Sequence, residues 1–231
     1  SESSRPTDAS SGAPIGLGPT TPLGGERNPT LSAGVTREDS PFHFELMTPR
    51  SGIDFVYYGS PTPEAYMTQQ NGGGVALADF DNDRQLDIFL VNGSDFHRPA
   101  GELKTSNRLY RAAGNFRYED VTQSAGLVAH GFGMGCTAGD YDNDGFTDLF
   151  VACYGRDRLW HNNGDGTFTE ETDSAGIGSE LWGSSAALAD LDGDGLLDLY
   201  VVNYVEWSSD EPPCHPQGHP EINSVCFPIN R

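Results

Sequence analysis

An acidic nonapeptide occurs three times in this chain and restricts the folds that the chain can adopt. Each copy carries aspartates at its first, third, fifth and ninth positions, and the copies begin at Asp79, Asp140 and Asp190. Holding four carboxylates together without a cation costs several kcal/mol of mutual repulsion in a partly desolvated loop. Ca²⁺ is a hard cation that takes six to eight oxygen ligands, so the pattern predicts calcium loops. The predicted metal ligands are Asp79, Asp81, Asp83, Gln85 and Asp87 in the first loop, Asp140, Asp142, Asp144, Phe146 and Asp148 in the second, and Asp190, Asp192, Asp194, Leu196 and Asp198 in the third.

The sixth and seventh positions refine this prediction. The seventh residue of each loop is expected to contribute its backbone carbonyl oxygen. The sixth residue is Gly145 or Gly195 in two loops, where glycine permits a sharp turn, but it is Arg84 in the first loop. If the sixth position is left-handed, arginine costs on the order of 1 kcal/mol in backbone strain there. We therefore expect two to three Ca²⁺ ions, with the first site the weakest.

An EF-hand begins with a similar loop and is the main alternative for the calcium chemistry. It requires a bidentate acid at the twelfth position, where this chain has Leu90, Val151 and Val201. It also requires flanking helices, whereas these flanks are rich in β-branched and aromatic residues. Mg²⁺ is disfavoured because it prefers few carboxylates and keeps its waters.

The segments around the loops repeat as well. Residues 44–53, 118–127 and 168–177 align without gaps and share an aromatic residue, a threonine, a glycine and an aliphatic residue at fixed offsets. Each is expected to form a short strand followed by a glycine turn. Short apolar runs on both sides of every acidic loop predict buried strands. The repeating unit is therefore strand, acidic loop, strand, strand, turn, strand.

This unit predicts an all-β fold of β-propeller blades. The loops begin 61 and 50 residues apart, which suits four-stranded blades. We expect about three blades, built from eleven or twelve strands, and hence an incomplete propeller. An ordinary β-sandwich is the alternative. The expected domains are a disordered Ser/Pro/Gly-rich tether over residues 1–41 and a propeller segment over residues 42–231, with calcium loops at 79–87, 140–148 and 190–198 and a cysteine loop at 214–226.

The four cysteines suggest an oxidising compartment. A cross-strand disulfide Cys136–Cys153 is expected, because the two residues flank the second loop at similar distances; two buried free thiols are the alternative. A local disulfide Cys214–Cys226 is expected across the proline-rich loop. A zinc site made by these last two residues with His215 and His219 is a weaker reading, because the spacing does not match the usual Cys pairs.

Charge and motifs exclude several functions. The net charge is −21, from 34 acidic and 13 basic residues, which argues against nucleic acid as a partner. Three Ca²⁺ ions would reduce that charge to −15 (−21 + 6). No stretch is apolar enough to span a membrane. No phosphate-binding loop or nucleophile elbow occurs, so no catalytic residue is predicted. The glycosylation sequon at Asn92 is expected to be structural, since Asn203 occupies the same repeat position.

The repeats resemble the FG-GAP/VCBS repeats of integrin-α-type propellers and, more narrowly, the ASPIC/UnbV family to which cartilage acidic protein is similar. The resemblance rests on Gly-Gly-Gly-Val-Ala-Leu-Ala before Asp79, on residues 158–168, and on Ala-Asp-Leu-Asp-Gly-Asp-Gly at the third loop. It implies a propeller of about seven blades with calcium hairpins on one face and a role in adhesion or matrix contact. It carries over no catalytic residue. Arg84, the turn at 112–115 and Cys153 depart from the pattern.

The sequence thus predicts a secreted, calcium-binding, non-catalytic scaffold or adhesion module that contacts a protein or glycan. The alternatives are the propeller part of a secreted enzyme, of lyase or phospholipase type, and a structural subunit of a surface filament or large complex. A closed propeller needs four or more blades. A partner chain or further C-terminal blades are therefore expected to cover the exposed strand edges.

Overall fold

The computed structural model describes residues 44–60, 62, 66–95, 105–208, 215 and 221. The chain divides into two compact units, Ser1–Glu45 and Leu46–Arg231, and every helix and strand given below belongs to the second. The expected tether over residues 1–41 and the expected disulfide Cys214–Cys226 lie outside the described residues. Of the alternative zinc site, only His215 is described.

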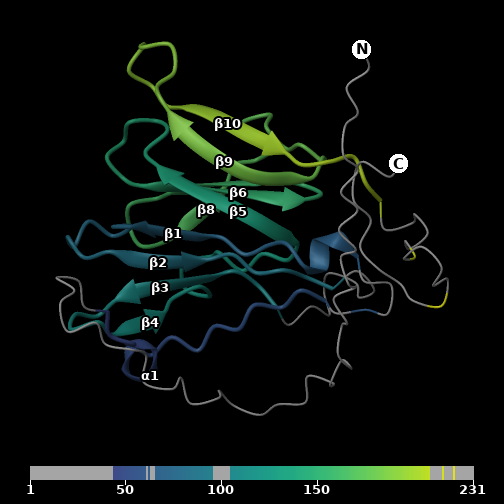
Figure 1. The fold of residues 1–231 in the computed structure, drawn as a ribbon. Helices are drawn as coiled ribbons and strands as arrows, with labels where there is room; N and C mark the ends of the chain where they lie inside the picture. Colours follow the sequence, from purple (N-terminus) through teal and green to yellow (C-terminus); the bar gives the residue numbers. More distant parts are fainter. Residues whose placement is uncertain are drawn as a thin grey trace, which may run out of the picture. The chain divides into compact units, whose positions relative to one another are not determined.

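The second unit is built from three antiparallel sheets that follow one another in chain order (Figure 1). The first two sheets have four strands each, with neighbouring strands consecutive in sequence, and the third has two. The elements are α1 (Thr48–Ser51), the 3₁₀ helix η1 (Met67–Gln69), β1 (Val75–Ala78), β2 (Asp87–Leu90), β3 (Arg108–Ala112), β4 (Tyr118–Asp120), β5 (Phe132–Gly139), β6 (Asp148–Tyr154), β7 (Arg158–Asn162), β8 (Phe168–Glu170), β9 (Gly183–Ala189) and β10 (Asp198–Asn203).

This architecture confirms the predicted all-β, blade-like and incomplete fold. We call β1–β4 blade 1, β5–β8 blade 2 and β9–β10 the half-blade. Within the described residues, ten strands form rather than eleven or twelve. Among those residues, no helix is long and apolar enough to cross a membrane.

The strand expected at Phe44 does not form. Residues 44–47 have no regular structure, α1 follows them, and Phe44 is 97% exposed. The aligned residues Tyr118 and Phe168 begin β4 and β8, which pair with β3 and β7. The described residues begin at Phe44 and include no preceding strand that could play the part of β3. A strand whose backbone groups have no neighbour to bond is not stable alone, and the described residues offer this motif no such neighbour.

The glycine turn of the same motif is confirmed at all three places. Gly52, Gly126 and Gly176 have φ angles of 85°, 76° and 69°, which only glycine adopts without strain. The recurring threonine also has a clear role. The hydroxyl oxygens of Thr122 and Thr172 accept the backbone N–H groups of the third strand in their blades, at 2.9 Å in both cases.

The apolar strand β6 shows why its residues do not alternate with polar ones. Leu149 and Val151 belong to the core between blade 1 and blade 2. Phe150 and Ala152 belong to a separate core that includes Leu199 of the half-blade. A blade is covered on both faces, so both sets of side chains must be apolar.

The innermost strands of the three sheets approach closely. A Cβ atom added at Gly74 before β1 would lie 3.0 Å from the Cα atom of Gly135 in β5. A Cβ added at Gly135 would lie 2.8 Å from the carbonyl oxygen of Ser184 in β9. Backbone against backbone at these distances leaves no room for a side chain, which explains glycine at positions 74 and 135 before the first two loops.

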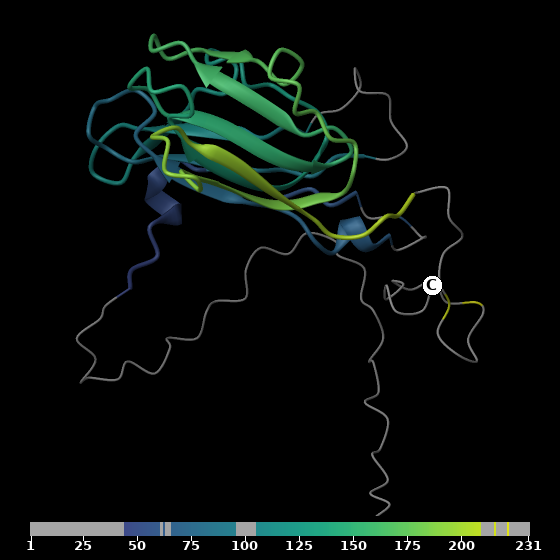
Figure 2. The same cartoon turned by 90° about the horizontal axis from the view of Figure 1, so that it is seen from above.

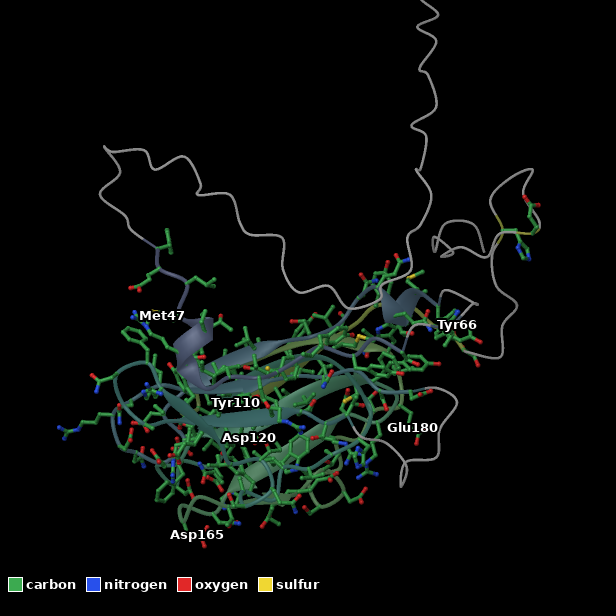
Figure 3. All side chains as sticks on the ribbon, turned by 90° about the horizontal axis from the view of Figure 1, so that it is seen from below. Met47, Tyr66, Tyr110, Asp120, Asp165 and Glu180 are labelled. Carbon is green, nitrogen blue, oxygen red and sulfur yellow. The ribbon has the colours of Figure 1, made fainter. Side chains whose placement is uncertain are left out.

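The helices α1 and η1 lie at opposite ends of blade 1 (Figure 2), and described residues between them bond to the blade. Met47 and Tyr66, labelled in Figure 3, directly precede these two helices. The hydroxyl of the fully buried Tyr110 donates to Asp54 at 2.8 Å. The backbone N–H of Tyr58 donates to the Asn92 side-chain oxygen at 2.7 Å. The side-chain nitrogen of buried Asn92 donates to the Ser106 carbonyl oxygen, so the expected structural role of this sequon residue is confirmed.

The half-blade leaves one face uncovered. Tyr200 and Val202 of β10 are 62% and 45% exposed. Their repeat counterparts in β6, Phe150 and Ala152, are both 0% exposed because the half-blade packs on them. Tyr200 and Val202 therefore occupy positions that are buried wherever another sheet follows.

Candidate metal centres: three linked acidic loops

The three acidic loops lie at one end of the sheets, on the left of Figure 1, where β1, β5 and β9 end. Direct hydrogen bonds connect them. The side-chain nitrogen of Asn82 donates to the Gly145 carbonyl oxygen at 3.1 Å, and that of Asn143 donates to the Gly195 carbonyl oxygen at 3.0 Å. The asparagine at the fourth position of one loop thus reaches the sixth residue of the next. The third loop has Gly193 at its fourth position and offers no such amide.

Each loop curls through two left-handed residues, at its fourth and sixth positions. In the first loop Asn82 and Arg84 have φ angles of 58° and 70°. The condition set out for Arg84 is therefore met: the sixth position is left-handed, and arginine bears the corresponding strain there. The corresponding φ angles of Gly145 and Gly195, at the sixth position of the other loops, are 94° and 90°.

The first aspartate of each loop holds this curl in place. Asp79 accepts the backbone N–H groups of Asp83 and Arg84, at 3.0 and 2.7 Å. Asp140 does the same in the second loop, and Asp190 accepts from the third loop's fourth and sixth residues. These bonds gather the carboxylates on the concave side of the loop.

The ninth aspartate ties the loop to its blade. In blade 2, the side chain of Asp148 is fully buried and accepts the backbone N–H groups of Tyr141 and Asn162 at 3.0 and 2.8 Å. Asp87 accepts the equivalent pair of N–H groups in blade 1. Burial raises the pKa of both carboxyls, and the two backbone hydrogen bonds oppose that rise. A buried carboxylate that carries this cost is one that a cation would stabilise.

Asp198 differs from its two counterparts. It accepts the Leu191 N–H at 2.8 Å, but it is exposed, because the half-blade has no third strand among the described residues to supply the second donor.

The aspartates come together in four sets that could hold a metal ion, with ligand atoms within 4.8 Å of one another in each set. Asp83 and Asp198 belong to none of these sets. The sets contain only side-chain ligand atoms, so the predicted backbone carbonyl ligands of Gln85, Phe146 and Leu196 remain predictions. The sets are Asp79, Asp81 and Asp87; Asp140, Asp142 and Asp144; Asp190, Asp192 and Asp194; and Asp142, Asp148 and His161.

The first loop departs from the other two at Asp83. One oxygen of this carboxylate accepts the Gln85 backbone N–H at 2.7 Å, and the other accepts the Gln85 side-chain nitrogen at 2.9 Å. The seventh residues of the other loops, Phe146 and Leu196, have no side-chain donor. The glutamine therefore competes for an oxygen that would otherwise be available to an ion, in addition to the strain at Arg84.

Sequence reasoning missed His161, which had no evident partner in the chain. The structure places its Nδ1 atom 3.3 Å from Asp142 Oδ2 and 3.4 Å from Asp148 Oδ1. The signal was the register of β6 and β7, which pairs Leu149 with Trp160 and so brings the neighbouring Asp148 and His161 together. That register cannot be read from the histidine alone.

The expected disulfide Cys136–Cys153 is wrong in this structure, where both residues are free thiols. In the β5–β6 register Cys136 lies opposite Val151, and Cys153 lies opposite Gly133 beyond a register shift. Residues offset by two along an antiparallel pair lie about 7–8 Å apart, with their Cβ atoms somewhat closer, whereas a disulfide needs Cβ atoms about 3.5–4.5 Å apart. Burial raises the pKa of both thiols to about 12, so both remain protonated near neutral pH.

Comparison with known proteins agrees with this geometry. Over 82 residues the chain is 34% identical to human (Homo sapiens) cartilage acidic protein 1 and, at 33%, similar to the mouse (Mus musculus) protein of the same name. The matched stretch covers 34% of this chain but spans only 12% of the length of each relative. A family model described as an FG-GAP-like repeat matches residues 79–151 and 140–201, each beginning at the first aspartate of an acidic loop. These two matches together span residues 79–201, more than half of the chain, so the chain belongs to the FG-GAP-like repeat family.

Proposed function

We propose that this chain is a calcium-stabilised, non-catalytic interaction module of β-propeller type. The observation that carries the proposal is the chain of Asn82–Gly145 and Asn143–Gly195 hydrogen bonds, which links three carboxylate-rich loops along one end of successive sheets. An ion in one loop would stabilise that loop and, through these bonds, its neighbour.

The donor set fits Ca²⁺. The first three sets of aspartates offer only carboxylate oxygens, which a hard cation prefers, and the loops present them without a helix on either side. The net charge of −21 gives the folded chain a further reason to bind cations. When bound, the ion supplies positive charge at the point where each hairpin reverses, so part of its binding energy becomes folding energy.

A role in adhesion or scaffolding outside the cell follows from the same chemistry. Exposed loops of this kind suit compartments rich in free calcium, since extracellular modules bind the ion at about 10⁻⁴–10⁻³ M. The uncovered face at Tyr200 and Val202 supports the presence of a further blade, supplied by another chain or another part of the protein, because the same positions in β6 are buried by the next sheet.

Thermal unfolding of the full chain in excess Ca²⁺ and in excess EGTA tests the calcium proposal. We expect a higher melting temperature with Ca²⁺, and equilibrium dialysis should show two to three bound ions per chain. Asp140→Asn should lower the number of bound ions by one, because Asp140 organises the second loop. Glu119→Gln, which removes a charge at an exposed position outside the loops, should leave the number unchanged. An identical melting temperature in both buffers would refute the proposal.

A further inference from the structure

The second acidic loop differs from the others because a histidine joins it. His161 Nδ1 lies 3.3 Å from Asp142 Oδ2 and 3.4 Å from Asp148 Oδ1, and the three ligand atoms lie within 4.8 Å of one another. This nitrogen is buried, yet it makes no hydrogen bond. Buried polar atoms are nearly always paired, so a nitrogen held between two carboxylates without a hydrogen bond needs an explanation.

The distances fit a bound metal ion. Ligands of a tetrahedral ion at about 2.0–2.1 Å are separated from one another by about 3.3–3.4 Å, which matches both nitrogen–oxygen separations. One nitrogen and two carboxylate oxygens form a donor set suited to Zn²⁺ and related borderline divalent ions. Calcium takes oxygen ligands and gains nothing from the imidazole.

The surroundings hold these ligands in position. The fully buried side chain of Asp148 is fixed by two backbone N–H donors. The imidazole packs edge-on against the Tyr141 ring at a centroid distance of 6.3 Å. Its other nitrogen, Nε2, faces Asp144 Oδ2 at 3.9 Å. A carboxylate that accepts the second N–H is the usual means of orienting a metal-bound histidine, and the 3.9 Å separation is longer than such a hydrogen bond.

Blade 1 cannot form the same site. The register of β2 with β3 and of β6 with β7 makes Arg111 the counterpart of His161. Arg111 is a permanent cation that pairs with Glu119 at 3.3 Å, and a guanidinium does not bind metals. The half-blade has no third strand among the described residues. The mixed site therefore belongs to blade 2 within the described part of the chain.

We propose that Asp142, Asp148 and His161 form a site for a borderline divalent metal ion such as Zn²⁺, adjoining the second acidic loop. The inference rests on the proposed function only in that Asp142 also belongs to a predicted calcium loop. It gives blade 2 a metal preference that the two other loops do not have.

Zinc titration of the full, untagged and metal-depleted chain by calorimetry tests this site, with Ca²⁺ kept in constant excess. Co²⁺ serves as a second probe, because its visible absorption reports a nitrogen-containing tetrahedral site. We expect one site whose Zn²⁺ affinity falls at least tenfold in His161→Gln, together with loss of the Co²⁺ absorption. His130→Gln is the matched control and should bind as the parent does, because its ring nitrogen contacts the Thr105 carbonyl oxygen and the residue belongs to none of the four sets.

The outcomes separate this inference from the calcium proposal. Zinc affinity that is unchanged in His161→Gln, or that falls equally in His130→Gln, overturns the mixed site even if Ca²⁺ still raises the melting temperature. Zinc binding that depends on His161 in a chain indifferent to Ca²⁺ supports the site and refutes only the calcium proposal. If His161→Gln fails to fold in EGTA, His161→Arg, which introduces the blade 1 residue type, replaces it and is expected to show the same loss.

Discussion

Replacing Asp157 with asparagine should stabilise the protein at neutral pH. Asp157 is a 1% exposed carboxyl between blade 2 and the half-blade. One of its oxygens accepts the Cys153 backbone N–H at 2.8 Å, and the other has no hydrogen-bond partner. Burial raises its pKa from 3.8 to about 6, which the single backbone hydrogen bond only partly opposes. The ionised form is therefore less stable in the folded chain than in the unfolded chain.

The magnitude follows from that pKa. A change from 3.8 to about 6 corresponds to about 3 kcal/mol once the group is ionised in both states. Asparagine removes the charge and can keep the bond to Cys153, since Asn107 at the matching place in blade 1 accepts the Asn92 N–H at 2.9 Å. Allowing for imperfect placement of the new amide, we expect Asp157→Asn to gain about 1–3 kcal/mol above pH 6. That gain corresponds to a rise in melting temperature of about 2–4 °C per kcal/mol.

The pH dependence has a definite sign. Between pH 3.8 and about 6 the folded parent binds more protons at Asp157 than the unfolded chain, so this residue makes stability fall as pH rises. The advantage of Asp157→Asn should therefore be full above pH 6 and shrink toward zero as pH approaches 3.8. Urea unfolding of both chains at several pH values, at constant free Ca²⁺, measures the difference.

The reciprocal change is the matched control. Asn107→Asp introduces a buried carboxyl into blade 1 and should destabilise the chain above pH 6 while costing little at low pH. If Asp157→Asn instead lowers stability by the same amount at every pH, then the ionised carboxylate has a stabilising partner and the reasoning is refuted.

Three further changes test the contacts that join the sheets and shape the loops. Asn162→Ala should lower the free energy of unfolding in urea by about 2–4 kcal/mol, because this fully buried amide donates to the carbonyl oxygens of Phe80 at 2.8 Å and Thr147 at 3.0 Å. A similar loss in the control Asn163→Ala, at an exposed position, would contradict that account. Arg84→Gly should raise the free energy of unfolding by about 1 kcal/mol even in EGTA, because φ at this position is 70°. A gain seen only with Ca²⁺ would instead assign the effect to repulsion between the arginine charge and the ion. Gly135→Ala should lower the melting temperature measured by circular dichroism, since its Cβ would lie 2.8 Å from a backbone oxygen of β9. An unchanged melting temperature would mean that β5 and β9 can move apart to admit a methyl group at no cost in stability.

Much of the site could be predicted from residues close together in the sequence. The spacing of aspartates at the first, third, fifth and ninth positions predicted loops that gather carboxylates, and the structure forms those sets. Arg84 was expected to be strained if the sixth position is left-handed, and its φ of 70° meets that condition. These features depend on local backbone geometry, which short-range sequence encodes directly.

Other features failed because they depend on a partner strand. The aromatic-Thr-Gly motif occurs at Phe44 as it does at Tyr118, yet only the second begins a strand, since only it has a described neighbour with which to pair. Cys136 and Cys153 flank the loop at similar distances, but the register offsets them by two residues and keeps them as thiols. A register error of that size cannot be detected from spacing alone.

Local periodicity and turn chemistry are enough to predict the repeating unit, the blade-like all-β fold and the residues of the acidic loops. They do not predict that the loops connect through Asn82 and Asn143, or that His161 joins Asp148 from a different strand. These contacts join atoms 13 to 63 residues apart in the chain, so their distances are set by strand register and by the packing of one sheet on the next.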